Sequence, residues 1–467
     1  MATPDPDPGP HPDPLAKPGD GTATGTLRRT LTFRDLVVYG LLFIAPMAPV
    51  GVFGTLVAKA HGAVALVYLV ATVAMAFTAY SYAQMVRVAP RAGSVYTYAR
   101  VGLGEGPGFI AGWMAMLDYL LIPAVAYLFS GIAMHALVPS VPGWVWTAAA
   151  VLVTTALNLT GVRAAALVGF LVLAMEIAVL AVFVVAAAVA LAQDGPRRDW
   201  LTPLTGEGGF DLGAVLAAVS VAVLSYLGFD AIASFAEESA GGSEKVARAV
   251  VTCLAVAGVL FVLQTYLAAL LAPMSPAELA AEPARQGAAF YDTVDTATGA
   301  WLHDLVAVSK AIGAAFAALA GQAAAGRLLF AMARDRRLPG LLAKVDRGSG
   351  VPRLALLGAA VVTLLAAVWA ARRDDGLDRL VSVVDVGALC AFALLHMSVI
   401  GWFGVRGRGD RVGVVRHVVV PLVGLAVVVA VIVSASWTAL VVGGVWLGVG
   451  LVVLVGRRWF PVRAGVG

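Results

Sequence analysis

The sequence predicts an all-α integral membrane protein with twelve transmembrane helices, and three observations support this prediction. The first is composition: 60% of the 467 residues are hydrophobic and 13% are charged, whereas soluble proteins are about half apolar and a quarter charged. The second is a series of apolar runs of about 20 residues, the length that crosses a bilayer. The third is that two of these runs contain residues that interrupt a helix near its middle.

The apolar runs follow one another with short loops between most of them, which indicates one compact bundle without a soluble domain. We place them at 36–58, 63–86, 107–136, 143–160, 165–192, 211–236, 249–272, 300–328, 354–371, 380–402, 414–434 and 437–456.

The chain ends are polar. Residues 1–30 are rich in Pro, Gly and Thr and are expected to form a disordered tail. The first apolar run begins only after Arg28 and Arg29 and has no small-residue cleavage site, so it is expected to remain as a spanning helix rather than a signal peptide. The membrane domain is expected over 31–457, with a second short tail at 458–467.

The basic residues predict the orientation. If the N-terminus is cytoplasmic, 24 of the 32 Lys and Arg residues fall on the cytoplasmic side. Cytoplasmic loops of membrane proteins carry such an excess. We therefore expect a multi-pass protein of the cytoplasmic membrane with both termini inside the cell.

The first interrupted segment is 45–54 in the first run. Pro46 and Pro49 each remove a hydrogen-bond donor from the helix ladder. The helix should stop near Met47 and restart near Gly51. A restarted half-helix directs free N–H groups and the positive end of its dipole toward the break, which favours an anion. The unpaired carbonyl groups before the break favour a cation.

The second interrupted segment is 223–238 in the sixth run, with Gly228, Phe229 and Asp230 at its centre. Gly228 leaves a helix readily, and Asp230 is expected to cap the half-helix that follows. Many secondary transporters build substrate sites from such discontinuous helices. Breaks in the first and sixth helices fit two inverted five-helix repeats, at about 34–192 and 211–402, followed by two further helices at about 414–456.

Four acidic residues lie inside apolar runs: Asp118, Glu176, Asp230 and Asp385. A charge at the bilayer centre costs at least about 2.5–3.5 kcal/mol, so each should face the bundle interior. Lys310 is the obvious buried counter-charge. This excess of acids provides for a cationic substrate or for protons. We expect Asp118 to bind a substrate ammonium group, with a structural hydrogen-bonding role as the alternative.

Several segments resemble the amino acid–polyamine–organocation permeases, over essentially residues 31–457. Within that superfamily the pattern is most similar to bacterial putrescine and amino acid importers. The segments are Pro90 to Arg100, Tyr226 to Ala231 followed by Ala236-Glu237-Glu238, Ala320 to Ala323, and Arg327 to Asp335 with Leu338-Pro339.

The resemblance implies a leucine-transporter-like fold of five plus five helices with two more. It places a substrate carboxylate on the amides of Val50, Gly51 and Val52. The substrate ammonium is then expected at carbonyl groups near Met47, Ala48, Leu224 and Leu227, and Tyr226 is expected among the substrate-binding residues. Gly228 and Asp230 shape the second break, while Phe229 and Tyr96 act as gates. Pro49 departs from the family's usual glycine-rich pattern and has no backbone N–H. The carboxylate site therefore has fewer hydrogen-bond donors, and an amine is favoured over an amino acid.

Glu176 stands where related permeases often place a lysine whose ammonium replaces a sodium ion. A buried carboxyl group can hold a proton near neutral pH. Glu176 is therefore a candidate carrier of a coupling proton, and a structural contact to the neighbouring helices is the alternative.

The predicted function is import of a small amine or amino acid, such as a putrescine-like polyamine, by proton symport and alternating access. One alternative is an exchanger of the same fold, and another is a ligand-binding sensor or accessory subunit. The sequence has no zinc-type His/Glu cluster, nucleophile elbow or phosphate loop, so no enzyme is expected. Partners are expected to be the substrate, protons and the lipid bilayer, with no cofactor, metal or nucleic acid.

Overall fold

The computed structural model describes residues 31–91, 93–160, 162–346, 351–373, 376–406, 413–435 and 437–459. Within these ranges the chain is largely helical and contains no strand; one isolated β-bridge joins Leu31 and Ser239. The predicted disordered tail at 1–30 and most of the tail at 458–467 lie outside the described residues.

Eleven helices in the described ranges are long and apolar enough to cross a membrane. This is one fewer than the twelve expected, because α6 (Gly143–Thr160) at the fourth predicted run is a shorter apolar helix. The uninterrupted spans are α3 (Val64–Val88), α5 (Glu105–Leu137), α7 (Val162–Asp194), α10 (Gly242–Leu271), α13 (Ala300–Arg334), α14 (Arg353–Ala371), α15 (Gly376–Val399) with η6 (Ile400–Val405), η7 (Val415–Val419) with α16 (Val420–Val433), and α17 (Trp437–Trp459).

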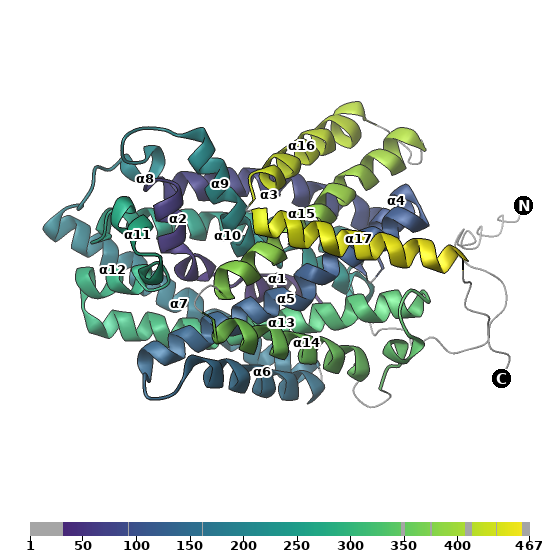
Figure 1. The fold of residues 1–467 in the computed structure, drawn as a ribbon, viewed down its shortest axis with the longest axis horizontal. Helices are drawn as coiled ribbons and strands as arrows, with labels where there is room; N and C mark the ends of the chain where they lie inside the picture. The colour runs from purple at the N-terminus through teal and green to yellow at the C-terminus, as the bar shows by residue number, and fades with distance from the viewer. Residues whose placement is uncertain are drawn as a thin grey trace, which may run out of the picture.

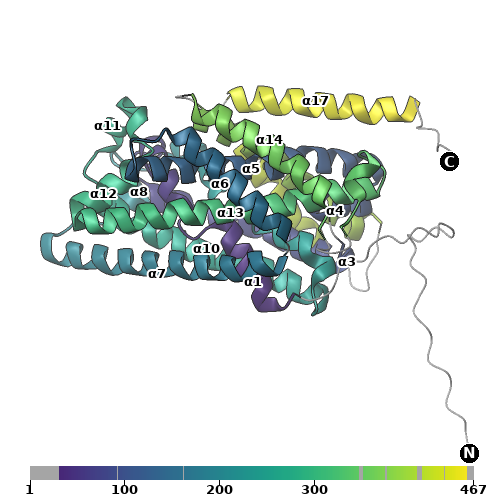
Figure 2. The ribbon, with the colours of Figure 1, turned by 90° about the horizontal axis from the view of Figure 1, so that it is seen from below.

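The helices form one bundle whose long members run side by side (Figure 1). At its centre α5 packs against α13, α15 and α4, and α3 packs against α10. The last helix, α17, lies along one edge of the bundle in Figure 2. Only 17% of its most apolar stretch is buried against the rest of the protein. An apolar helix with so little protein around it is suited to contact lipid.

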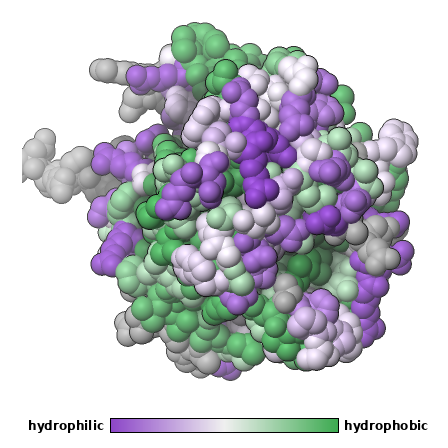
Figure 3. Space-filling view, turned by 90° about the vertical axis from the view of Figure 1, so that its left-hand side faces the viewer, coloured by the Kyte–Doolittle hydropathy of each residue, from purple (hydrophilic) through white to green (hydrophobic). Residues whose placement is uncertain are grey.

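Short helices cover the two ends of the bundle. One end carries α8 (Thr202–Thr205), α11 (Pro276–Ala281), η4 (Pro283–Arg285) and α12 (Ala289–Thr298), and the other carries α4 (Ser94–Leu103) and η5 (Gly340–Ala343). Figure 3 views the first end and shows hydrophilic residues gathered across the middle of that face. A polar end on an apolar bundle is the distribution expected where helices leave a bilayer.

The first spanning segment is interrupted at its middle. Its first half, α1 (Phe33–Ile44), begins at a capping box formed by Thr32 and Asp35. The helix ends at Ala45, and a 3₁₀ turn, η1 (Ala48–Gly51), separates it from α2 (Phe53–Lys59). Pro46 and Pro49 account for this, because neither can donate the backbone hydrogen bond that a continuous helix requires.

The sixth segment is also interrupted, at the glycine that the sequence indicates. Helix α9 (Leu212–Ala222) tightens into η2 (Val223–Tyr226), and η3 (Asp230–Glu238) follows. Gly228 has φ +122°, a left-handed conformation that side chains rarely adopt. A Cβ atom there would lie 2.9 Å from Phe43 Cγ and 3.0 Å from Ile44 N. The two breaks therefore touch, with Gly228 packed directly on the end of α1.

Candidate functional site

A small cavity of about 50 Å³ lies between the two breaks and is closed on its other sides by α5 and α13. Ala48, Leu224 and Leu227, all predicted site residues, line it. Its walls are otherwise almost entirely apolar, and Lys310 is the one ionisable residue among them. The further lining residues are Phe43, Ile44, Ala45, Ile122, Pro123, Val125, Ala126, Phe129, Ser225, Ala314, Ala317 and Ala318.

Lys310 brings a positive charge to the wall of this cavity. Its Nζ donates a hydrogen bond to the Met47 carbonyl at 3.1 Å and lies 5.2 Å from the centre of the Phe129 ring. The carbonyl group predicted to bind a substrate ammonium thus already accepts a hydrogen bond from the protein's own ammonium. The sequence identified Lys310 as a counter-charge for buried acids, but it gave no signal for this contact.

The amides predicted to bind a substrate carboxylate are partly used within the break. The N–H of Val50 donates to the Met47 carbonyl at 3.1 Å, and that of Val52 donates to the Pro49 carbonyl at 3.1 Å. At Gly51 an added Cβ would lie 2.7 Å from the Phe129 ring, so this ring covers the segment. In this conformation a carboxylate reaches these amides only if the turn opens and Phe129 moves.

Two aromatic residues predicted at the site point away from the cavity. The Tyr226 hydroxyl donates to the Tyr68 carbonyl at 3.0 Å and lies 2.7 Å from Thr72 Oγ1, which fixes it against α3. Phe229 is fully buried, with its ring centre 6.0 Å from that of Tyr82. Phe43 instead lines the cavity beside Gly228. The sequence signal that could have identified Phe43 is its position as an aromatic residue just before the break at Pro46.

Asp230 holds the second break together. One carboxyl oxygen accepts a hydrogen bond from the Gly228 N–H at 3.1 Å, and the other accepts from the Tyr119 hydroxyl at 2.7 Å. The carboxylate therefore reaches back across the break to residue 228. It was predicted to cap the half-helix that follows, and the backbone N–H groups of Asp230 and Ala231 at the start of η3 also interact with it. The carboxylate thus contacts backbone on both sides of the break.

Asp118 lies on α5 one turn from Ile122, a residue of the cavity wall. Its charge interacts with those of Asp230 and Asp385. Asp385 approaches because α15 packs closely on α5: a Cβ at Gly387 would lie 3.2 Å from the Asp118 backbone nitrogen. Each of Asp118 and Asp385 has a buried Oδ1 without a hydrogen-bond partner. We call Asp118, Asp230 and Asp385 the aspartate cluster.

Glu176 lies on α7 and faces α13. It is fully buried, and neither carboxyl oxygen has a hydrogen-bond partner. Gly313, three residues after Lys310 on α13, leaves room for it, because a Cβ there would lie 2.9 Å from Glu176 Cγ. The charges of Glu176 and Lys310 interact without a direct hydrogen bond between them. Glu176 thus has a cation in its neighbourhood.

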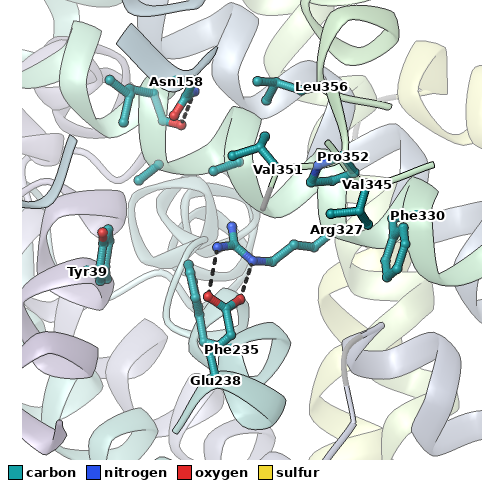
Figure 4. Close-up of a pocket in the computed structure, with 14 residues that line it drawn as sticks. Tyr39, Asn158, Phe235, Glu238, Arg327, Phe330, Val345, Val351, Pro352 and Leu356 are labelled. Atoms are coloured by element: carbon teal, nitrogen blue, oxygen red, sulfur yellow. Dashed lines mark hydrogen bonds and ion pairs between the residues drawn. The ribbon is translucent and has the colours of Figure 1, made fainter. Parts of the chain in front are cut away.

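A second cavity, of about 60 Å³, lies nearer the α4 end of the bundle (Figure 4). The Arg327 guanidinium donates to both carboxyl oxygens of Glu238, at 2.8 and 3.4 Å, and lies 4.2 Å from the centre of the Phe235 ring. Tyr39 stacks on the same ring at 5.3 Å. This ion pair joins η3 to α13 at the wall of the cavity.

Tyr96, predicted as a gate, belongs to a polar network beside this cavity. Its hydroxyl donates to Asp335 at 2.8 Å, and Arg100 forms an ion pair with the same carboxylate. Burial and the neighbouring Asp335 raise the pKa of Tyr96, which therefore stays protonated as a donor. Arg334 pairs with Glu237 close by. The network fastens α4 and η3 to the end of α13.

A family model of amino acid permeases matches residues 36–455. The low-affinity putrescine importer PlaP of Escherichia coli is 28% identical over 446 residues, covering 93% of this chain and 94% of the importer. The branched-chain amino acid permease BcaP of Bacillus subtilis is 26% identical over 461 residues, covering 92% of each chain. The methylthioribose transporter of the same organism is 28% identical over 395 residues, covering 80% of this chain and 81% of the transporter.

Proposed function

Because this chain belongs to the amino acid permease family, a family of membrane transporters rather than enzymes, we propose that it imports a small amine or amino acid by alternating access. The observation that supports this most is the contact between the two interrupted helices. Gly228 of the sixth segment packs on Phe43 of the first, and the cavity begins at that contact. Discontinuous helices that meet in the middle of a bundle are a recurrent way to build a substrate site.

The proposed substrate site comprises the two breaks and the adjoining turn of α5. From the first break it takes Met47, Ala48, Val50, Gly51 and Val52, and from the second it takes Leu224, Tyr226, Leu227, Gly228, Phe229 and Asp230. Asp118 binds the substrate ammonium, because its unpartnered oxygen lies one turn from the cavity wall.

An amine and an amino acid differ in how they meet Lys310. A carboxylate entering the cavity would be attracted to the Lys310 ammonium, which supports an amino acid. A cationic amine can enter only if the Lys310 charge is balanced. Lys310 must therefore keep its hydrogen bond to the Met47 carbonyl and its electrostatic interaction with Glu176. The relation to a putrescine importer and Pro49 in the carboxylate-binding turn favour the amine.

We place the chain in the cytoplasmic membrane with both termini inside, on the distribution of basic residues. The end that carries α4 and η5 then faces the cytoplasm, and the cavity lined by Arg327 and Glu238 lies on the inward path. Transport is proton symport in this proposal. Glu176 is the carrier of a coupling proton, since it is a buried carboxyl group without a hydrogen-bond partner.

The test is uptake by the purified full-length protein in proteoliposomes. Labelled putrescine and a panel of labelled amino acids are offered with and without an imposed pH gradient. Accumulation of at least one of them, increased when the inside is alkaline, is the expected result. Exchange for internal substrate without net accumulation in any gradient would instead identify an exchanger.

A further inference from the structure

The aspartate cluster contains more negative charge than the structure neutralises. Its three members come from α5, η3 and α15 and are 3%, 2% and 5% exposed for Asp118, Asp230 and Asp385. Asp118 adjoins both of the others: Gly387, two residues after Asp385, packs against the Asp118 backbone nitrogen, and the charges of Asp230 and Asp385 both act on Asp118. Two carboxyl groups that share a site cannot both ionise easily, and a third adds to that cost.

The three carboxyl groups are not equivalent. Asp230 accepts hydrogen bonds from Tyr119 and from the Gly228 amide, so its negative charge is stabilised. Asp118 and Asp385 each have an oxygen that is buried and unpartnered. An ionised carboxylate without a donor or a cation is costly inside a protein, and it holds a proton instead. The geometry thus indicates that Asp230 is ionised, whereas Asp118 and Asp385 each hold a proton.

The tyrosines around the cluster add a second, independent observation. The Tyr82 hydroxyl is fully buried, interacts with Ser94, and lies within electrostatic range of Asp118 and Asp230. Tyr98, whose ring centre is 6.0 Å from that of Tyr82, has a buried hydroxyl without a partner. The surroundings of the cluster thus include buried hydroxyl groups that leave polar capacity for a proton or for ordered water.

The cations and histidines on the packed helices are engaged elsewhere in the described part of the chain. Lys310 donates a hydrogen bond to the Met47 carbonyl. Four arginines form ion pairs with other acids: Arg327 with Glu238, Arg334 with Glu237, Arg100 with Asp335 and Arg353 with Asp346. Of the histidines, His396 lies 2.9 Å from Ser81 and 3.3 Å from Thr78, and His417 stacks on Phe403. No described Lys, Arg or His forms a salt bridge to the cluster.

We propose that Asp385, acting with Asp118, binds a coupling proton of the transport cycle in addition to the proton assigned to Glu176. This inference rests on the proposed function. In the outward-facing state the Asp385 carboxylate takes a proton from external water, forming one O–H bond. In the inward-facing state the same bond breaks and the proton passes to cytoplasmic water. The closed conformation then holds Asp385 in neutral form, while Asp118 is neutral in the empty site and is compensated by the substrate ammonium in the occupied one.

Asp385 is therefore a positioning and proton-carrying residue on α15, outside the two broken helices. Closing the bundle around it requires its proton, since otherwise a second uncompensated charge would be buried beside Asp230. This links proton binding to the closure of the cavity without direct contact between proton and substrate.

The test compares exchange with accumulation in proteoliposomes, using the compound that the wild-type protein accumulates best among labelled putrescine and the amino acid panel. Asp385→Asn keeps the shape of the side chain but cannot release a proton. It should exchange internal for external substrate at close to the wild-type rate and lose accumulation driven by the pH gradient. Asp295→Asn, at an exposed position on α12, is the matched control and should keep both.

The outcomes separate this inference from the proposed function. If the wild-type protein shows no accumulation driven by the pH gradient, proton symport itself is wrong. If the wild type responds to the gradient and Asp385→Asn responds equally, only the proposed role of Asp385 is wrong. If Asp385→Asn loses exchange as well, Asp385→Glu decides: recovery of both activities supports the proton role, whereas failure to recover either shows a structural role and overturns it.

Discussion

The buried acids of this protein fall into two regions that solve the same electrostatic problem differently. Glu176 on α7 has a covalently fixed cation nearby, Lys310 on α13. Asp118 and Asp385, on α5 and α15, have no such partner and adjoin a third acid instead. A lysine ammonium compensates a neighbouring carboxylate without a proton from solution, whereas an acid without a cation can be compensated only by binding a proton. The first region therefore contains a compensating cation of its own, and the second depends on protons or on a cationic substrate.

The largest expected effect comes from removing the fixed cation. Lys310→Met leaves Glu176 buried without a cation and removes one of the two donors to the Met47 carbonyl, and breaking a buried charge pair in this way costs about 3–5 kcal/mol. The thermal unfolding midpoint of the purified protein should fall sharply. Adding Glu176→Gln to the same chain should recover much of the loss. If the double variant is as unstable as the single one, the two side chains are not electrostatic partners.

The next largest effect is expected at the contact between the breaks. Gly228→Ala places a Cβ at φ +122° and 2.9 Å from Phe43 Cγ. Backbone strain of this kind costs about 1–3 kcal/mol, and each 1.36 kcal/mol on a barrier is about tenfold in rate. Turnover measured by uptake should fall by roughly 5- to 160-fold, while the protein still inserts and purifies. Wild-type turnover in this variant would mean that the position of Asp230 relative to Asp118 and Asp385 does not depend on Gly228.

Glu176→Gln tests whether the first region also moves a proton. The variant leaves the Lys310 charge uncompensated, so the cavity becomes permanently positive. Equilibrium binding should persist, accumulation driven by the pH gradient should be lost, and an amino acid should be bound better than an amine. A variant that still concentrates substrate against its gradient would leave Glu176 only as the electrostatic partner of Lys310.

Asp118→Asn separates a substrate contact from a structural one. A charged hydrogen bond to an ammonium contributes about 1.5–3 kcal/mol, so the apparent KM for putrescine should rise by roughly tenfold. Uptake of any transported neutral amino acid should change less, because its ammonium has other acceptors. Equal losses for both substrate classes would assign Asp118 to packing.

The smallest effect is expected from Asp230→Asn. The oxygen of an asparagine side chain can still accept the hydrogen bond from the Gly228 amide, and its NH₂ group can donate to the Tyr119 hydroxyl, which then acts as the acceptor. Uptake should therefore stay near the wild-type rate. Asp230→Leu removes both acceptors and should reduce uptake strongly. A fully active leucine variant would show that the carboxylate does not maintain the break.

The sequence was most informative where local backbone chemistry decides the structure. Pro46, Pro49 and Gly228 interrupt helices for reasons contained in their own covalent geometry, so both breaks were predictable. The burial of Asp118, Glu176, Asp230 and Asp385 followed as directly from their apolar surroundings.

What the sequence could not provide were contacts between distant helices. Lys310 reaches Met47 across 263 residues, and the direction of Tyr226 depends on Tyr68 and Thr72 on another helix. The spacing of apolar residues and the composition of a helix do not determine which of its faces packs against which face of another helix. The same limit applies to the aspartate cluster, whose members are each visible in sequence and whose proximity is not.

The isolated bridge between Leu31 and Ser239 has a mechanical consequence. The Leu31 N–H donates to the Glu238 carbonyl at 2.9 Å, and the Ala240 N–H donates to the Leu31 carbonyl at 2.9 Å. Each such bond contributes about 0.5–1.5 kcal/mol, and together they join the free ends of α1 and η3. The two half-helices are thus linked at both extremities, by this bridge and by the contact of Gly228 with Phe43. Because these contacts join them at both ends, we expect α1 and η3 to move together rather than separately when the cavity opens.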